Sequence, residues 1–415
     1  MNRQFYVLMH RYVGLVMAIF LVIIGLTGSV IAFMSELDAF VNPHLMKVER
    51  QNAALLSPVL LREKIAKQYS EASINRIPLS IKNDEAVIFS LEVRSKSSET
   101  KPAELENDEV FINPYTGEIL GVRKWGDVTQ GFKNLIPFIY KLHFSLAIGD
   151  FGSYVLGIVA LLWTLDCFVG AYLTFPSSKV GHINVAKIQR KSWLKRWQPA
   201  WFVRYKASAY KINYDLHRAG GLWVWAMLFV FAWSSVGFNL QQVYNPVMRG
   251  LFNSAYADDD EKKPAPTERP NLNWQQALNK SRLLMQQAAK ENGFKVMGEN
   301  YISYNQTSAK YYYRVKTNLD VNERHGNSEL TLDAMTGKQL SLYIPNNIKT
   351  GDIINNWLFT LHMGHLWGLP MQVFICLMGL VITMLSITGV VIWLKKRKAK
   401  LIALNNPEAK RKVLT

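Results

Sequence analysis

Long apolar stretches alternate with polar ones along this chain. Four of the apolar stretches reach the length of about 20 helical residues that crosses a hydrocarbon core of about 30 Å. The first three contain no Lys or Arg, and the fourth is uncharged until Lys395. They cover residues 12–34, 153–175, 220–240 and 371–394. The pattern predicts an α-helical membrane protein with four transmembrane helices.

Basic residues precede the first apolar stretch, as they do in a secretory signal peptide. The stretch is 23 residues long, which exceeds the apolar region of a signal peptide, and no small-residue cleavage motif follows it. We therefore expect an uncleaved anchor.

The charged residues are unevenly distributed. The net charge is +17, from 48 Lys and Arg against 31 Asp and Glu. Seventeen basic residues, against two acids, lie in residues 176–216 and in the C-terminal tail. Residues 35–150 carry 14 basic and 16 acidic groups, and residues 241–369 carry 14 and 12. Because basic loops mark the cytoplasmic side, we expect both termini and the short connection inside and the two long segments outside.

Charge and composition also exclude several classes of protein. Basic residues that flank membrane helices, without a Cys/His finger or an RNP-like run, argue against nucleic acid as a partner. The two cysteines exclude a disulfide scaffold and a Cys-rich zinc or iron–sulfur module. The 49% of hydrophobic residues excludes a disordered chain.

The chain contains an internal repeat. Five matches follow one another in the same order at offsets between 203 and 220 residues. They pair His10-Arg11 with His217-Arg218, Asn42-Pro43 with Asn245-Pro246, Thr116-Gly117 with Thr336-Gly337, Leu142-His143 with Leu361-His362, and Gly170 with Gly389. The repeat predicts a duplicated unit of helix, extracytoplasmic α+β domain and helix. Since both copies start inside, a rotation near 180° about the membrane normal should relate them.

Each long segment has the pattern of an α+β domain. We expect helices over 60–66 and 274–289, the second with Asn273 as N-cap, and strands over 86–93 and 311–317. The Thr-Gly pairs suit hairpin turns, and residues 258–270 suit a solvated linker. The expected boundaries are 1–34, 151–175, 220–240 and 370–394 for the helices, 35–150 and 241–369 for the outer domains, 176–219 for a basic loop and 395–415 for a basic tail.

Four of the eight histidines occupy repeated positions at the ends of the predicted helices. His10 and His217 lie at the cytoplasmic ends of the first and third, and His143 and His362 lie at the outer ends of the second and fourth. One interfacial histidine commonly snorkels or caps a helix, but four symmetric ones favour ligation. Paired imidazoles on facing helices hold haem iron. Without a Cys-x-x-Cys-His motif, any haem is a non-covalent b type.

Other residues near these histidines have open roles. Arg11 and Arg218 either pair with haem propionates or belong to the positive-inside pattern. Asp166, the acid within the predicted helices, serves proton movement, holds a ring nitrogen of an axial histidine, or has a hydrated structural role. His365 lies one turn after His362, on the same face if that segment is helical.

Other metals fit this pattern less well. Zinc requires three or four ligands close together, whereas only His362 and His365 are close and no HExxH motif exists. Copper favours clusters of Met and Cys, whereas the 14 Met are scattered.

The clearest family motif lies around the fourth apolar stretch. It consists of residues 361–370 (LHMGHLWGLP), Gly379-Leu380 and residues 386–393 (SITGVVIW). Together with the His-Arg openings and the Thr-Gly turns, it resembles the PepSY-associated transmembrane proteins, which include bacterial inner-membrane ferric-siderophore reductases. The resemblance covers nearly the whole chain. The family usually has Arg at position 365, where His365 either keeps a cationic role or offers an alternative ligand.

The resemblance implies a multi-pass protein of the bacterial inner membrane with two periplasmic PepSY-like domains. It implies a reductase with two b haems that passes electrons outward and reduces the iron(III) of a ferric siderophore to iron(II). We expect His10 and His217 to hold the cytoplasmic haem, and His143 and His362 the periplasmic one.

The electron donor is not encoded in the chain. No dinucleotide fingerprint or P-loop is present, so electrons come either from a quinol dissolved in the membrane lipids or from a cytoplasmic flavin reductase. The tryptophans of the third apolar stretch, Trp223, Trp225 and Trp233, either line a quinol site or form an aromatic belt.

Two other functions compete with this interpretation. Anchored PepSY-like domains can act as periplasmic protease regulators or sensors, but that role leaves the four symmetric histidines without a purpose. A metal permease would need more than one acid in its membrane helices, or a pair of broken helices at the midplane. The colour of the purified protein separates haem binding from both.

The charge distribution generates the first prediction. A reporter that works only in the cytoplasm should be active when it is fused after Thr415, because the basic tail keeps that end of the chain inside. A reporter that works only in the periplasm should be inactive there. Fusions within residues 35–150 should give the opposite result. Periplasmic activity of the Thr415 fusion would refute the proposed orientation.

Overall fold

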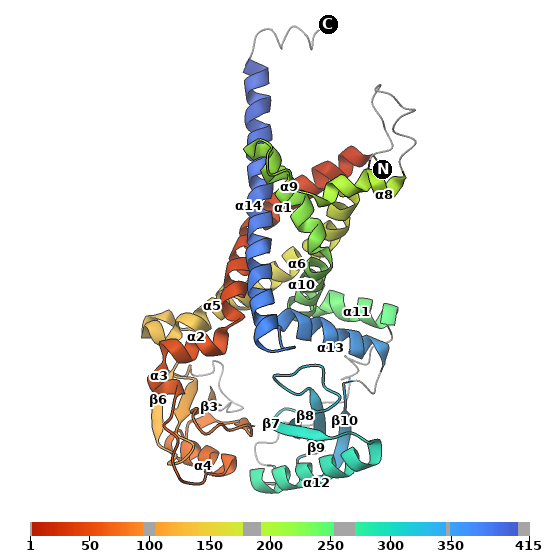
Figure 1. Cartoon of the computed structure of the whole chain (residues 1–415). Helices are drawn as coiled ribbons and strands as arrows, with labels where there is room; N and C mark the ends of the chain where they lie inside the picture. Colours follow the sequence, from red (N-terminus) through yellow and green to blue (C-terminus); the bar gives the residue numbers. More distant parts are fainter. Residues whose placement is uncertain (1, 94–103, 177–191, 253–269, 346–348, 406–415) are drawn as a thin grey trace. The chain divides into compact units, whose positions relative to one another are not determined.

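The computed structural model describes residues 2–93, 104–176, 192–252, 270–345 and 349–405 (Figure 1). The linker expected at 258–270 lies outside these residues, except for Pro270, as do residues 177–191 of the expected basic loop. The chain forms two compact units, which are described separately. The first unit comprises Met1–Val30, Leu142–Tyr244 and Val373–Thr415, and the second comprises Ile31–Lys141 and Asn245–Gln372.

The first unit is a bundle of long apolar helices. Among the described residues, α1 (Arg3–Ile31), α6 (Gly149–Thr174) and α14 (Leu369–Asn405) contain segments long and apolar enough to cross a membrane. The pair α9 (Ala209–Trp223) and α10 (Trp225–Asn239) makes a fourth crossing if it is counted as one. The chain is therefore mostly helical, with three to four candidate membrane spans, as a multi-pass membrane protein has.

The third span differs from its prediction as one continuous helix over 220–240. The chain breaks at Val224, and the axes of α9 and α10 meet at 70°. An indole on each side of the break is held by a different partner: Trp223 Nε1 donates to Trp201 O at 3.0 Å, and Trp225 Nε1 donates to Cys167 O of α6 at 2.8 Å. These two anchors fix the bend, and hydrophobicity alone does not reveal them.

Helices α1 and α14 cross with their backbones in contact. A Cβ added at Gly25 would lie 2.7 Å from Gly379 O, and Ser29 Oγ donates to Cys376 O across the same crossing at 2.8 Å. Small residues and an interhelical hydrogen bond are the means by which membrane helices associate. This crossing holds the first and last spans of the chain together.

The second unit contains small antiparallel sheets. Its first segment supplies α2 (Met34–Val41), α3 (Pro43–Met46), α4 (Pro58–Gln68), β1 (Ala72–Ser73), β2 (Arg76–Pro78), β3 (Val87–Ser90), β4 (Glu92–Val93), β5 (Glu109–Ile112) and β6 (Ile119–Arg123). Its second segment supplies α11 (Gln241–Phe252), α12 (Trp274–Asn292), β7 (Val296–Asn305), β8 (Lys310–Thr317), β9 (Ser328–Asp333), β10 (Gln339–Tyr343) and α13 (Thr350–Met363). The remaining described helices are α5 (Leu135–Ser145) and α8 (Trp193–Trp197), with 3₁₀ turns at Val128–Gln130, Phe132–Asn134 and Gln198–Trp201.

The two segments of this unit share one sheet and one core. Strand β2 pairs antiparallel with β7, so the sheet order is β10-β9-β8-β7-β2, beside a separate sheet β3-β5-β6. The apolar core likewise combines side chains of both segments, such as Phe89 and Ile77 with Ile302 and Tyr311. The two segments therefore fold against each other.

Local signals in the sequence position several of these elements correctly. Asn273 caps α12 in a reciprocal capping box with Gln276. The two Thr-Gly turns close hairpins with the same hydrogen bonds: Asn113 and Asp333 each accept from the backbone two and three residues on. Donors from Thr336 and Met335 hold the pKa of the Asp333 carboxyl below its usual value.

A buried ion cluster ties α2 to β6. Both terminal nitrogens of Arg123 donate to the Asp38 carboxylate at 3.0 and 2.9 Å, and its Nε donates to Glu109 at 2.7 Å. The Arg123 side chain is 2% exposed. Because removing one partner would leave a buried charge uncompensated, this cluster fixes where α2 meets the sheet.

The α1–α14 crossing generates the second prediction. Replacing Gly25 by Leu should lower the free energy of unfolding by about 1–3 kcal/mol, because the side chain has no room against Gly379. Thermal unfolding in detergent measures this. The control is Gly250→Leu in α11, where a Cβ meets no atom within 4 Å. Equal melting temperatures for the two variants would contradict the close crossing.

Candidate functional site

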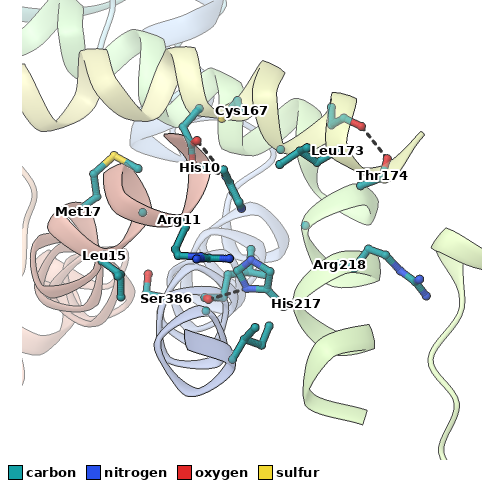
Figure 2. A pocket seen from close by; sticks show the side chains of 18 of the residues that line it. His10, Arg11, Leu15, Met17, Cys167, Leu173, Thr174, His217, Arg218 and Ser386 are labelled. Carbon is teal, nitrogen blue, oxygen red and sulfur yellow. Dashed lines mark hydrogen bonds and ion pairs between the residues drawn. The ribbon is translucent and has the colours of Figure 1, made fainter. Parts of the chain in front are cut away.

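A cavity of about 470 Å³ lies within the helices of the first unit (Figure 2). Residues of α1, α6, α9, α10 and α14 line it, most of them apolar. Its volume is in the range of small-molecule and cofactor sites, which combine apolar walls with a few polar groups. His10 and His217 are two of those polar groups.

The two imidazoles meet across the cavity. His10 comes from α1 and His217 from α9, with ring centroids 6.1 Å apart and ring planes 57° apart. Figure 2 shows the two rings directed toward one another. The sequence repeat predicted that these two residues act as a pair, and the fold brings them together.

Each ring is held by its Nδ1 atom. His10 Nδ1 lies 2.9 Å from both carboxylate oxygens of Asp166. His217 Nδ1 lies 2.9 Å from Leu385 O and 3.1 Å from Thr388 Oγ1. A carbonyl and a carboxylate only accept hydrogen bonds, so both Nδ1 atoms carry the proton. The Nε2 lone pair of each ring is then available to a ligand in the cavity.

Glycines make room for both rings. A Cβ at Gly170 would lie 3.5 Å from His10 Cε1, and a Cβ at Gly389 would lie 3.1 Å from His217 Cε1. Gly14 follows His10 by one helical turn and also lines the cavity, but a Cβ there would meet no atom within 4 Å. Gly14 therefore borders open space beside the imidazole, where a flat ligand can approach the helix backbone.

Cations surround the same cavity. Arg3, Arg11, Arg218 and Lys396 all line it. Arg218 donates to Asp215 at 3.0 Å and to Pro199 O at 2.8 Å, and Arg3 donates to Leu173 O at 2.6 Å. Among the residues that line the cavity, Asp166 is the acidic one, and its carboxylate accepts from His10 Nδ1. The cavity therefore suits a ligand that is apolar over most of its surface and carries anionic groups.

The separation of the rings fits one metal ion between them. A bond from a metal to an imidazole nitrogen is about 2 Å long, and each nitrogen is about 1 Å from its ring centre, so two axial rings have centroids about 6 Å apart. No group of three or more His, Cys, Asp and Glu that would hold a bare metal ion occurs in the described chain. The two imidazoles, the apolar walls and the surrounding cations together fit a flat cofactor such as haem, which His10 and His217 would hold through their Nε2 atoms.

The other two histidines that the sequence predicts as haem ligands, His143 and His362, lie in different units of the structure. His143 lies on α5 in the first unit, with Nδ1 3.1 Å from Thr27 Oγ1, and a Cβ at Gly28 would approach its Cε1 to 3.0 Å. His362 lies at the end of α13 in the second unit. Their pairing on a second haem stays a prediction.

The condition on which His365 would share a helical face with His362 is not met. Helix α13 ends at Met363, and Gly364 adopts φ +66° as its C-cap. His365 therefore does not continue the helical face of His362. Its ring packs edge-on against His325, with centroids 5.5 Å apart. Burial, together with His325 and Arg324, lowers the pKa of His365 to about 4, so it is neutral at physiological pH.

The tryptophans of the third span do not form a single group. Trp225 lines the cavity, Trp223 is exposed, and Trp233 packs against Tyr244 with centroids 5.0 Å apart. The sequence reasoning missed the roles of Gly14 and Thr388. A signal for Gly14 was present, because both His-Arg openings place glycine four residues after the histidine.

Comparison with known proteins gives one match. The model of a protein family described as PepSY-associated TM region matches residues 7–396. No curated protein sequence matches the chain.

The open space beside Gly14 generates the third prediction. Gly14→Leu should sharply lower the haem content of protein expressed with added haem, because the side chain enters the cavity. The apoprotein should fold normally, since a Cβ at this position meets no atom within 4 Å and Leu is the better helix former by about 1 kcal/mol. Absorbance and thermal unfolding measure the two effects. Haem content equal to that of Gly250→Leu would count against this cavity as the site.

Proposed function

The chain belongs to this PepSY-associated transmembrane family, and on that premise we propose that it is a haem-b electron-transfer protein of the membrane that reduces ferric siderophores. The observation that carries the proposal is the pair His10 and His217, 6.1 Å apart across one cavity, with each Nδ1 occupied by an acceptor.

The proposed architecture is a duplicated unit of helix, PepSY-like domain and helix, in the bacterial inner membrane with both termini inside. Three features support the duplication: α4 and α12 each precede antiparallel strands, the two Thr-Gly turns share their hydrogen bonds, and the contacts of His10 with Gly170 and of His217 with Gly389 recur at matching positions. The uneven charge supports the orientation.

Each residue of the cavity has a defined task in this proposal. His10 and His217 would hold the haem iron through their Nε2 atoms, and their Nδ1 partners fix the ring orientations. Arg11 would pair with a haem propionate. Arg218, which is paired with Asp215, is a second cation of the cavity lining. The apolar walls exclude water from the macrocycle. When haem is bound, its iron supplies one-electron chemistry, which requires no nucleophile or acid–base pair from the protein.

The substrate is the iron of a ferric siderophore. Siderophores hold iron(III) through hard oxygen donors. Iron(III) takes up one electron and becomes iron(II), which these donors hold far more weakly, so reduction releases the metal without breaking a covalent bond. The ligation of a second haem by His143 and His362, with His365 as the alternative ligand, stays a prediction of the sequence repeat. The electron donor is a quinol or a cytoplasmic flavin reductase.

The fourth prediction tests haem ligation directly. Purified protein should show a Soret band, and sharp α and β bands after reduction by dithionite. His10→Ala and His217→Ala should each reduce the haem content from two equivalents to one. The control is His44→Ala, because His44 is exposed on α3 of the second unit and should leave the content unchanged.

Two results would overturn the proposal. The first is a colourless protein after expression with added haem. The second is two full haem equivalents in the variant that lacks both His10 and His217. Reduction of a ferric siderophore by the reduced protein, followed as trapping of iron(II) by a chelator, tests the substrate separately.

A further inference from the structure

A buried carboxylate is the partner of one of the two histidines. Asp166 lies on α6, and its side chain is 9% exposed. Both of its oxygens lie 2.9 Å from His10 Nδ1. Within the described chain, Asp166 makes no ion pair with Lys or Arg. A carboxylate is costly to bury in a membrane bundle unless it is compensated, and the His10 N–H provides that compensation.

The other histidine has neutral acceptors. His217 Nδ1 is held by the backbone oxygen of Leu385 and the hydroxyl of Thr388. The hydroxyl hydrogen of Thr388 is itself directed to Met384 O at 2.8 Å, which leaves its oxygen free to accept. No formal charge faces His217 Nδ1 at hydrogen-bond distance among the described residues.

This difference sits at matching positions of the two halves. Gly170 contacts His10 and Gly389 contacts His217, an offset of 219 residues. The same offset places Asp166 opposite Leu385. At this position the first half therefore presents the carboxylate side chain of Asp166 to its histidine, whereas the second half presents the backbone carbonyl of Leu385. The two imidazoles occupy equivalent positions, but the acceptor at Nδ1 is charged for His10 and neutral for His217.

We propose that Asp166 is a positioning and tuning residue that makes His10 the more strongly donating of the two ligands. This inference rests on the proposed haem function. An anionic acceptor draws the Nδ1 proton toward itself and raises electron density at Nε2. A more basic axial ligand stabilises the ferric over the ferrous state, so Asp166 holds the cavity's haem at a lower potential than a neutral acceptor would.

A lower potential at this position has a direct use. An electron that enters at this haem then moves to any acceptor of higher potential without an external driving force. The charge of Asp166 therefore makes onward transfer of an electron from this haem more favourable than a neutral acceptor would.

The fifth prediction separates charge from shape. Asp166→Asn keeps one oxygen that accepts from His10 Nδ1, removes the negative charge and replaces the other oxygen by an NH₂ group. At a fixed electrode potential, the ratio of ferrous to ferric iron in the haem held by His10 should rise about tenfold, because the hydrogen bonding of an iron ligand tunes the potential. A tenfold change is 59 mV for a one-electron couple. Asp166→Glu, which restores the charge, should return the ratio toward its original value.

The matched control acts on the other histidine. Thr388→Val removes the hydroxyl partner of His217 but leaves the Leu385 carbonyl, so it should change the ratio far less than Asp166→Asn does. Spectroelectrochemical titration of the α band measures the ratio of ferrous to ferric haem in each variant. Electron paramagnetic resonance of the ferric haem gives a second readout of ligand strength.

The outcomes distinguish this inference from the proposed function. If Asp166→Asn retains haem with unchanged potential and resonance, Asp166 has no tuning role and the inference fails. If Asp166→Asn loses haem while Asp166→Glu and Thr388→Val retain it, the charge is needed to hold His10 and the inference stands. A wild-type protein without haem defeats the proposed function itself, and this inference with it.

Discussion

The hydrogen bonds at the two Nδ1 atoms are the constraint on which the rest of the site depends. Each imidazole can offer a lone pair to the cavity only from a nitrogen that carries no proton, and a free imidazole has no fixed preference between its two nitrogens. Asp166 and Leu385 O remove the alternative by occupying Nδ1 on both rings. Both acceptors lie on helices other than those that carry the histidines. The ligand site therefore exists only when the bundle is assembled.

Assembly in turn depends on small residues. Gly25 and Gly379 let α1 and α14 touch through their backbones, and Gly170 and Gly389 leave space for the two rings. A larger residue at any of these positions would move a helix or displace an imidazole. Glycine is costly in helices because it loses more conformational freedom than other residues. In this bundle the glycines offset that cost, because they allow close helix packing and leave room for the two imidazoles.

Much of the architecture was predictable because its signals are local. Hydrophobic length predicted the positions of α1, α6 and α14, and the capping residue predicted the start of α12. The symmetric positions of His10 and His217 predicted their pairing. The break at Val224 was missed, because tertiary hydrogen bonds fix it. The sequence left open whether a helix continues to His365, and a glycine with positive φ ends α13 before it.

Other features depend on contacts that the sequence does not reveal. The three roles considered for Asp166 were equally compatible with a carboxylate near the end of an apolar stretch, and only the fold brings it to His10. The choice of Leu385 as a partner is hidden for a different reason, because the acceptor is a backbone oxygen that every residue possesses. Residue identity carries no information about such a bond.

The strand pairing of β2 with β7 has a consequence for biosynthesis. Arg76 faces Ser303 in this ladder, so more than two hundred positions of the chain separate the two partners. The first segment leaves the ribosome long before the second, with an unpaired strand edge and the apolar side chains of Ile74 and Ile77 uncovered. Such an edge pairs readily with other chains. The nascent protein therefore passes through a stage in which it needs protection from its neighbours until its second half arrives.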